Sequence, residues 1–147
     1  MNIIIIGAGV AAVSAIQAIR QHNKDIDITV YGEESYLPYK RIRLTKDLAY
    51  GIKPENLLLH KESWYQENHI RFQSNVKVAS IDPGNRRVFL SDGTTEEYSS
   101  LLLANGARNN VMPIKGIEKK EVFTLRSLED AQGILNQAQQ SRRVLII

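Results

Sequence analysis

The first twenty residues, MNIIIIGAGVAAVSAIQAIR, limit what this 147-residue chain can fold into more than any other stretch. No charged side chain occurs before Arg20. Such a run is typical either of a membrane or export signal or of a buried strand that turns into a helix. A signal peptide carries positive charge ahead of its apolar stretch, and none is present here. A membrane span needs about twenty apolar residues, and this run is interrupted by Gly7, Gly9, Ser14 and Gln17. The sequence therefore predicts neither an export signal nor a membrane segment.

A strand, a glycine turn, a helix and a second strand are predicted in its place. Ile3–Ile6 is a β-branched run, as expected for a parallel strand that is buried on both faces. Val10–Arg20 carries apolar residues at helical spacing. Ile28–Tyr31 has the β-branched and aromatic character of a second strand. This order is that of a βαβ unit.

The turn has the spacing GxGxxA, formed by Gly7, Gly9 and Ala12. In a dinucleotide-binding unit the first glycine allows the sharp turn, the second lets the backbone approach a pyrophosphate, and the third small residue permits close packing. The helix N-terminus adds free N–H groups and the positive end of the helix dipole. Glu33, at the end of the second strand, can accept hydrogen bonds from ribose hydroxyls. The sequence predicts a dinucleotide site here, and the alternative is a glycine turn that joins two core elements without a ligand.

The later part of the chain does not continue as the alternating helices and strands of a fully wound NAD domain. Residues 35–46 are expected to form an irregular loop, and residues 61–68 a helix. Four short strand-like runs follow, at residues 70–73, 76–82, 86–90 and 94–98. The turn signals between the later runs favour an antiparallel meander. Residues 101–104 predict another buried strand. The predicted fold class is therefore α/β: a Rossmann-like βαβ domain with a parallel sheet, plus an antiparallel β-meander.

Composition excludes several kinds of chemistry. The chain has no cysteine, which excludes disulfides, thiolate metal sites and a catalytic thiol, and agrees with a reducing compartment such as the cytoplasm. The net charge is only +3 and the basic residues form no long run, so nucleic-acid binding is not expected. The three histidines lack metal-ligand spacing, so no metal site is expected. No Ser–His–Asp arrangement indicates a hydrolase.

Four stretches resemble a known family: IIIIGAGVAA, ITVYGEESYLPYKRIRLTKDL, ENLLLHKESWYQENHIRF and YSSLLLANGAR. They resemble the FAD-dependent pyridine nucleotide–disulfide oxidoreductase superfamily. Within it they are most similar to the branch without a redox disulfide, which contains NADH:rubredoxin and ferredoxin reductases, NADH oxidases and the flavin part of assimilatory nitrite reductase. The segment VFTLRSLEDA is similar to this family's link into its NAD domain.

The resemblance implies an FAD-binding domain over residues 1–110. It implies that residues 111–147 form a linker and the start of an NAD(P)-binding domain, so that the chain is an N-terminal fragment. Residues 125–140, with Ser127 as N-cap, would form the helix before that domain's first strand. Val144–Ile147 would be the strand itself. Without neighbouring strands, these apolar residues favour disorder or self-association.

The resemblance also implies a set of FAD-binding residues. The diphosphate would lie against Gly7, Ala8, Gly9, Val10 and Ala11. The ribose acid would be Glu33 or Glu34, with Glu33 favoured because a glycine precedes it. Arg41 and Lys46 would lie along the phosphates and near the flavin ring, and the backbone of Val78 would meet the adenine. The motif that closes over the cofactor would be Ala104, Asn105 and Gly106.

Three positions depart from the family's pattern. Asn105 stands where the family has threonine, Ile42 where it has proline, and Thr45 where it has serine. These departures affect the details of the site more than the expectation of FAD itself.

The resemblance implies an NAD(P)H-dependent flavoprotein oxidoreductase. Electrons would pass from NAD(P)H through FAD to a redox partner such as rubredoxin, ferredoxin, a nitrite reductase centre or oxygen. No residue is assigned a catalytic role, and the fragment alone is expected to be inactive. Two other classes stay open: a non-catalytic nucleotide-binding or interaction module, and a plain NAD-binding Rossmann domain.

Overall fold

The computed structural model describes residues 1–146, and these residues form two compact units. The first unit consists of Met1–Tyr39 and Leu58–Gly106. The second consists of Lys40–Leu57 and the chain from Ala107 onward. No helix within residues 1–146 is long and apolar enough to cross a membrane.

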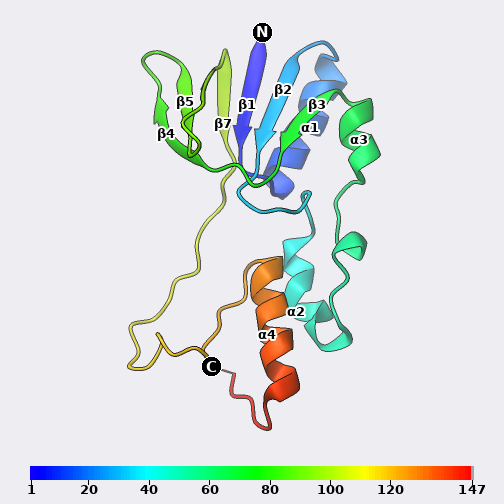
Figure 1. Ribbon diagram of the computed structural model, residues 1–147. Coiled ribbons are helices and arrows are strands. Elements are labelled where there is room, and N and C mark those ends of the chain that lie inside the picture. The colour runs from blue at the N-terminus through cyan, green and yellow to red at the C-terminus, as the bar shows by residue number, and fades with distance from the viewer. Residues whose placement is uncertain (147) are drawn as a thin grey trace. The chain divides into compact units, whose positions relative to one another are not determined.

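A four-stranded parallel sheet forms the centre of the first unit (Figure 1). Its strands are β1 (Asn2–Ile6), β2 (Asp27–Tyr31), β3 (Ile70–Gln73) and β7 (Ser100–Leu103). They lie in the order β3-β2-β1-β7, so β1 has a parallel partner on each side. This central position explains the uninterrupted β-branched run, because both faces of β1 are covered.

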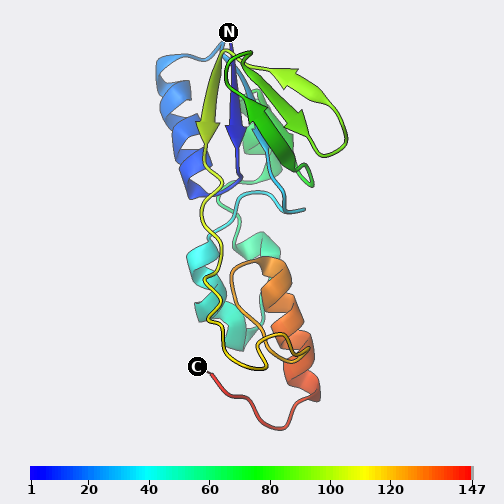
Figure 2. The same ribbon diagram turned by 90° about the vertical axis from the view of Figure 1, so that its left-hand side faces the viewer.

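The two faces of this sheet pack against different layers, as Figure 2 shows. On one face lie α1 (Val10–His22) and α3 (Glu62–Glu67), which enclose Ile5, Ile16 and Tyr65. On the other face lies a three-stranded antiparallel sheet, which encloses Ile4 and Val88. Its strands are β4 (Val78–Asp82), β5 (Arg87–Leu90) and β6 (Thr95–Glu97). Each fully buried aliphatic side chain contributes about 1.5–3 kcal/mol to the free energy of folding. The side chains on the two faces of β1 therefore hold both layers against the sheet.

The predicted fold class is confirmed, and most predicted elements agree with the structure to within a few residues. The placement of residues 70–73 was wrong, because they do not belong to the antiparallel meander. They form β3, which pairs in parallel with β2 at the edge of the main sheet, with Ile28 opposite Ile70. The reason is α3, which immediately precedes β3 and carries the chain back to start a parallel strand.

The predicted loop over residues 35–46 was wrong in its second half. Residues 41–50 form consecutive short helical turns: η1 (Arg41–Arg43), α2 (Leu44–Asp47) and η2 (Leu48–Tyr50). Leu44 is buried, although its neighbours are polar. Burial of one apolar residue among polar ones is a tertiary effect that the local pattern does not show.

The C-terminal helix of the second unit, α4 (Leu128–Gln140), begins at the predicted N-cap. The Ser127 hydroxyl accepts a hydrogen bond from Asp130 N at 3.0 Å, and the Asp130 carboxylate accepts one from Ser127 N at 2.9 Å. The predicted strand at the end of the chain is not present at residues 144–146, whose side chains are exposed. Its last residue, Ile147, lies outside the described residues. Self-association through this segment stays a prediction.

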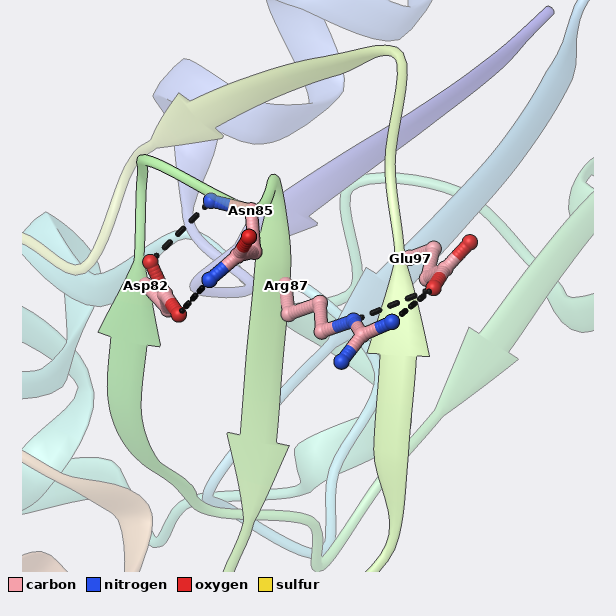
Figure 3. A network of polar contacts seen from close by, with 4 residues as sticks. All are labelled: Asp82, Asn85, Arg87 and Glu97. Atoms are coloured by element: carbon pink, nitrogen blue, oxygen red, sulfur yellow. Dashed lines mark hydrogen bonds and ion pairs between the residues drawn. The ribbon is translucent and has the colours of Figure 1, made fainter.

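Polar contacts hold one turn and one strand pair of the antiparallel sheet (Figure 3). Asp82 accepts hydrogen bonds from the Asn85 backbone N–H at 3.1 Å and from its side-chain amide at 2.7 Å. Across the next strand pair, Arg87 Nη2 lies 2.8 Å from Glu97 Oε1. The Asp82–Asn85 contacts close the turn that the Pro-Gly-Asn sequence predicts. The Arg87–Glu97 ion pair joins β5 to β6.

The hydrogen bonds from the Asn85 side chain and backbone hold the pKa of Asp82 below its ordinary value. A depressed carboxylate pKa stabilises the folded state above the unfolded-state pKa of about 3.9, and this contribution is lost as the pH falls through the folded value. We expect Asn85→Ala to raise the pKa of Asp82, measured by carboxyl NMR titration. Asp92 is the control, because Thr94 and not Asn85 lowers its pKa. An unchanged Asp82 pKa in the variant would contradict the assignment.

Candidate cofactor site

The turn after β1 is built around Gly7. Its φ of +107° lies in the region that side chains rarely adopt, and its N–H donates to Tyr31 O at 2.9 Å. A Cβ added to Gly7 would lie 2.3 Å from Ala104 O and 2.7 Å from Asn105 Cα. Two segments far apart in the sequence therefore meet here, and both were predicted to contact the cofactor.

Gly9 is the N-cap of α1, and its environment differs from that of Gly7. Its backbone is extended, with φ −107° and ψ −169°, so its conformation does not require glycine. A Cβ built on Gly9 meets no atom of the described residues within 4 Å. Its own side chain cannot cap the helix, and the first turn of α1 has no acidic residue. Neither packing nor backbone strain explains the glycine, and the open space leaves room for an anion to approach the helix N–H groups.

Gly32 is a second glycine in close contact with its surroundings, and in the sequence it stands directly before the predicted ribose acid. A Cβ on Gly32 would lie 2.9 Å from the Ala8 Cβ, although its φ is not positive. Its N–H donates to Gln73 O at 2.8 Å. The end of β2 therefore lies directly against the glycine turn. The signal in the sequence is a glycine placed between a strand and the predicted ribose acid.

The two candidate ribose acids have different surroundings. Glu34 Oε2 accepts a hydrogen bond from the Tyr39 hydroxyl at 2.6 Å, which ties this carboxylate to the following loop. The Glu33 side chain is 70% exposed, and its carboxylate lies 3.2 Å from Lys77 Nζ in an exposed ion pair. Such a pair is worth only about 0–1 kcal/mol, so it is easily exchanged for a ligand. Glu33 is therefore the more available acceptor.

Val78 begins β4 and is half-buried in the cluster that contains Tyr31 and Leu90. It follows Lys77, the partner of Glu33, so the start of β4 lies near the end of β2. The predicted contact between its backbone and an adenine stays a prediction.

Tyr31, at the end of β2, contacts the glycine turn through its backbone carbonyl. Burial raises the pKa of its phenol, and the nearby Glu96 carboxylate adds to the rise. The phenol therefore stays neutral at physiological pH, as a core residue must, while the Tyr31 carbonyl accepts the Gly7 hydrogen bond.

Arg41 and Lys46 belong to the second unit. Arg41 Nη1 donates to Arg126 O at 2.7 Å, just before the N-cap of α4. Lys46 lies on α2 and is exposed. Their predicted roles along the phosphates and near the flavin stay predictions.

The first-unit residues fit a bound dinucleotide on structural grounds. They provide an open helix N-terminus, two glycines that keep neighbouring backbone close, and an exposed carboxylate after β2. Among residues 1–146, no group of three or more His, Asp or Glu side chains is arranged to hold a metal ion. The fold is that of a Rossmann-like α/β domain, and the turn after β1 is its candidate dinucleotide site.

A family model for pyridine nucleotide-disulphide oxidoreductases matches residues 1–147, and the chain belongs to that family. The predicted family is thereby confirmed, and it is a family whose members depend on FAD and use NAD(P)H.

Individual relatives agree with this assignment. The ferredoxin–NAD(+) reductase component of the biphenyl dioxygenase system of Paraburkholderia xenovorans is 37% identical over 99% of this chain and 36% of its own length. The nitrite reductase [NAD(P)H] of Bacillus subtilis is 32% identical over 99% of this chain and 18% of its own length. The crystal structure of NADH:rubredoxin oxidoreductase from Clostridium acetobutylicum superposes with a TM-score of 0.86 at 34% identity, over 95% of this chain and 36% of that one. The chain thus spans about a third or less of these relatives.

Proposed function

We propose that residues 1–110 form the FAD-binding part of an NAD(P)H-dependent oxidoreductase that works in a reducing compartment such as the cytoplasm. Residues 111–147 form the linker and the start of an NAD(P)-binding domain. The observation that carries the proposal is Gly9, an N-cap glycine that no contact among residues 1–146 requires and that leaves the start of α1 open.

Each part of the first unit has one task in this proposal. The N–H groups at the start of α1 bind the diphosphate, because free amides and the helix dipole both favour an anion there. Gly7 keeps Ala104 and Asn105 next to that turn. Glu33 accepts hydrogen bonds from the ribose of the adenosine half.

FAD, when bound, supplies hydride uptake from NAD(P)H and electron release to an acceptor. The names of the relatives indicate acceptors of the ferredoxin, rubredoxin and nitrite reductase classes. The acceptor in this proposal is a redox centre of one of these classes or oxygen. This chain's contribution is to bind and orient the adenosine and diphosphate end.

Calorimetric titration of the chain with FAD, ADP and NAD⁺ tests the proposal against its two alternatives. We expect FAD to bind more tightly than NAD⁺, and ADP to compete with FAD for the same site. Mass spectrometry of the ligand released from the denatured protein should give the mass of FAD. Tighter binding of NAD⁺, or release of NAD⁺ without flavin, would favour a plain NAD-binding domain. Binding of none of the three would favour an interaction module.

Matched variants of the two acidic residues separate binding from stability. Glu33→Gln is expected to weaken FAD binding by about tenfold, because charge-assisted hydrogen bonds to the ribose are lost. Its unfolding free energy should change by less than about 0.5 kcal/mol, because the ion pair with Lys77 is exposed.

Glu34→Gln should behave in the opposite way. It weakens the hydrogen bond from Tyr39 and is expected to lower the unfolding free energy by about 1 kcal/mol, with FAD affinity close to that of the parent chain. Calorimetry and urea denaturation measure the two quantities. If the two variants exchanged these effects, Glu34 would be the ribose acid.

A further inference from the structure

The chain contains a single Asn-Gly pair, Asn105–Gly106, directly after β7. Both residues are exposed, and Gly106 has φ +69°. Within residues 1–146, no hydrogen bond holds the Asn105 amide or the Gly106 N–H. The pair therefore combines three features: an accessible amide, a following residue without a side chain, and a backbone nitrogen with no partner.

We propose that Asn105 is a deamidation site. The Gly106 backbone nitrogen attacks the side-chain carbonyl carbon of Asn105, a C–N bond closes a five-membered succinimide, and the amide nitrogen leaves as ammonia. One water molecule then opens the ring at either carbonyl and gives aspartate or isoaspartate. The balance is one water consumed and one ammonia released, with no change of oxidation state. Glycine favours the attack because it has no Cβ to shield its nitrogen.

Two other positions in the chain have features that protect them from this ring closure. Asp92–Gly93 has the same kind of glycine neighbour, but the Asp92 carboxylate accepts a hydrogen bond from Thr94 N at 2.8 Å. The Gly93 nitrogen donates to Leu90 O at 3.1 Å, so it is not available for attack. Asn110 is exposed like Asn105, but it precedes Val111, whose branched side chain shields the backbone nitrogen.

The position of Asn105 gives the modification a consequence. A Cβ at Gly7 would lie only 2.7 Å from Asn105 Cα, so the backbone here is as close to the glycine turn as it can be. Isoaspartate inserts a methylene into this backbone, and both products add a negative charge. Under the proposed function, that charge lies beside the diphosphate, so deamidation weakens FAD binding. The threonine expected at this position in the family has no amide and cannot follow this route.

The site itself is tested without any cofactor. The chain is incubated at 37 °C at pH 7, 8 and 9, and peptide mapping by mass spectrometry follows the gain of about 1 Da at each asparagine. We expect Asn105 to react about tenfold faster than Asn110, because the glycine leaves the attacking nitrogen open. The rate at Asn105 should rise with pH, since the attacking nitrogen must lose its proton.

Asn105→Gln is the matched variant, because its longer side chain would have to close a less favourable six-membered ring. We expect the gain in mass at position 105 to fall to the level of Asn110. Equal rates at Asn105 and Asn110 in the parent chain, or a rate independent of pH, would overturn the proposal.

A second set of measurements, made with FAD, tests the deamidation site and the proposed cofactor position independently. Saturating FAD is expected to slow the reaction at Asn105 severalfold, and Asn105→Asp is expected to bind FAD about tenfold more weakly than the parent chain. Rapid deamidation with neither effect would support the modification site and contradict the position of the cofactor. Slow deamidation with FAD bound at the turn would overturn the modification site alone.

Discussion

Gly7→Ala is expected to lower the free energy of unfolding of the first unit by about 4 kcal/mol. The new Cβ would lie 2.3 Å from Ala104 O, a backbone atom that moves only if β7 moves. The φ of +107° adds strain that only glycine avoids. Overpacking and backbone strain each cost about 1–3 kcal/mol, and domains are stable by only about 5–15 kcal/mol. Urea denaturation followed by circular dichroism measures the loss.

Gly93→Ala is the matched control for this substitution. Gly93 has φ +90° in the same unit, but a Cβ there meets no atom within 4 Å. The control therefore carries the backbone strain without the collision, and we expect a loss of about 1–2 kcal/mol. An equal loss in the two variants would mean that the close approach of Ala104 to the turn is absent in solution.

Gly9→Asp is expected to abolish most of the FAD affinity, by about a hundredfold or more, while the fold becomes slightly more stable. The two effects have opposite signs because the same position has two roles. Aspartate is a preferred N-cap and interacts well with the helix dipole, which stabilises α1 by about 0.5 kcal/mol. The same carboxylate would repel a diphosphate at the helix N-terminus. Calorimetry with FAD and thermal denaturation without it measure the two effects.

Gly9→Ser serves as the neutral control, since serine caps a helix without adding charge. We expect its FAD affinity to fall between those of the parent chain and of Gly9→Asp. Wild-type affinity in Gly9→Asp would contradict the placement of the diphosphate. A large loss of stability in either variant would contradict the open space around Gly9.

The sequence predicts the first βαβ unit well because its signals are local. The β-branched run, the glycine turn and the helical spacing all lie within residues 1–31, and each element is followed directly by its partner. The assignment of β3 failed because a short alternating strand carries no information about its neighbour. Its parallel pairing with β2 depends on the path through α3. The short helices at 41–50 and the missing strand at 144–146 likewise depend on what is present to pack against them.

In the candidate site too, some features follow from the local sequence and others depend on tertiary packing. The two glycines of the turn are evident from their spacing, but the reasons for them differ, and only the structure separates the contact at Gly7 from the open space at Gly9. The choice between Glu33 and Glu34 depends on Tyr39, whose hydroxyl a sequence pattern does not place. One partner of Arg41 is a carbonyl 85 positions away. Spacing therefore predicts where the turn is, and packing decides which side chains remain available to a ligand.

Amide NMR of the ¹⁵N-labelled chain during titration with FAD tests the central placement most directly. At saturation we expect the largest shifts at the amides of Gly9, Val10 and Ala11, with a smaller set at Asn105 and Gly106. Saturable binding of FAD that leaves the amides of residues 9–11 unmoved would contradict the proposal that the diphosphate lies at the start of α1.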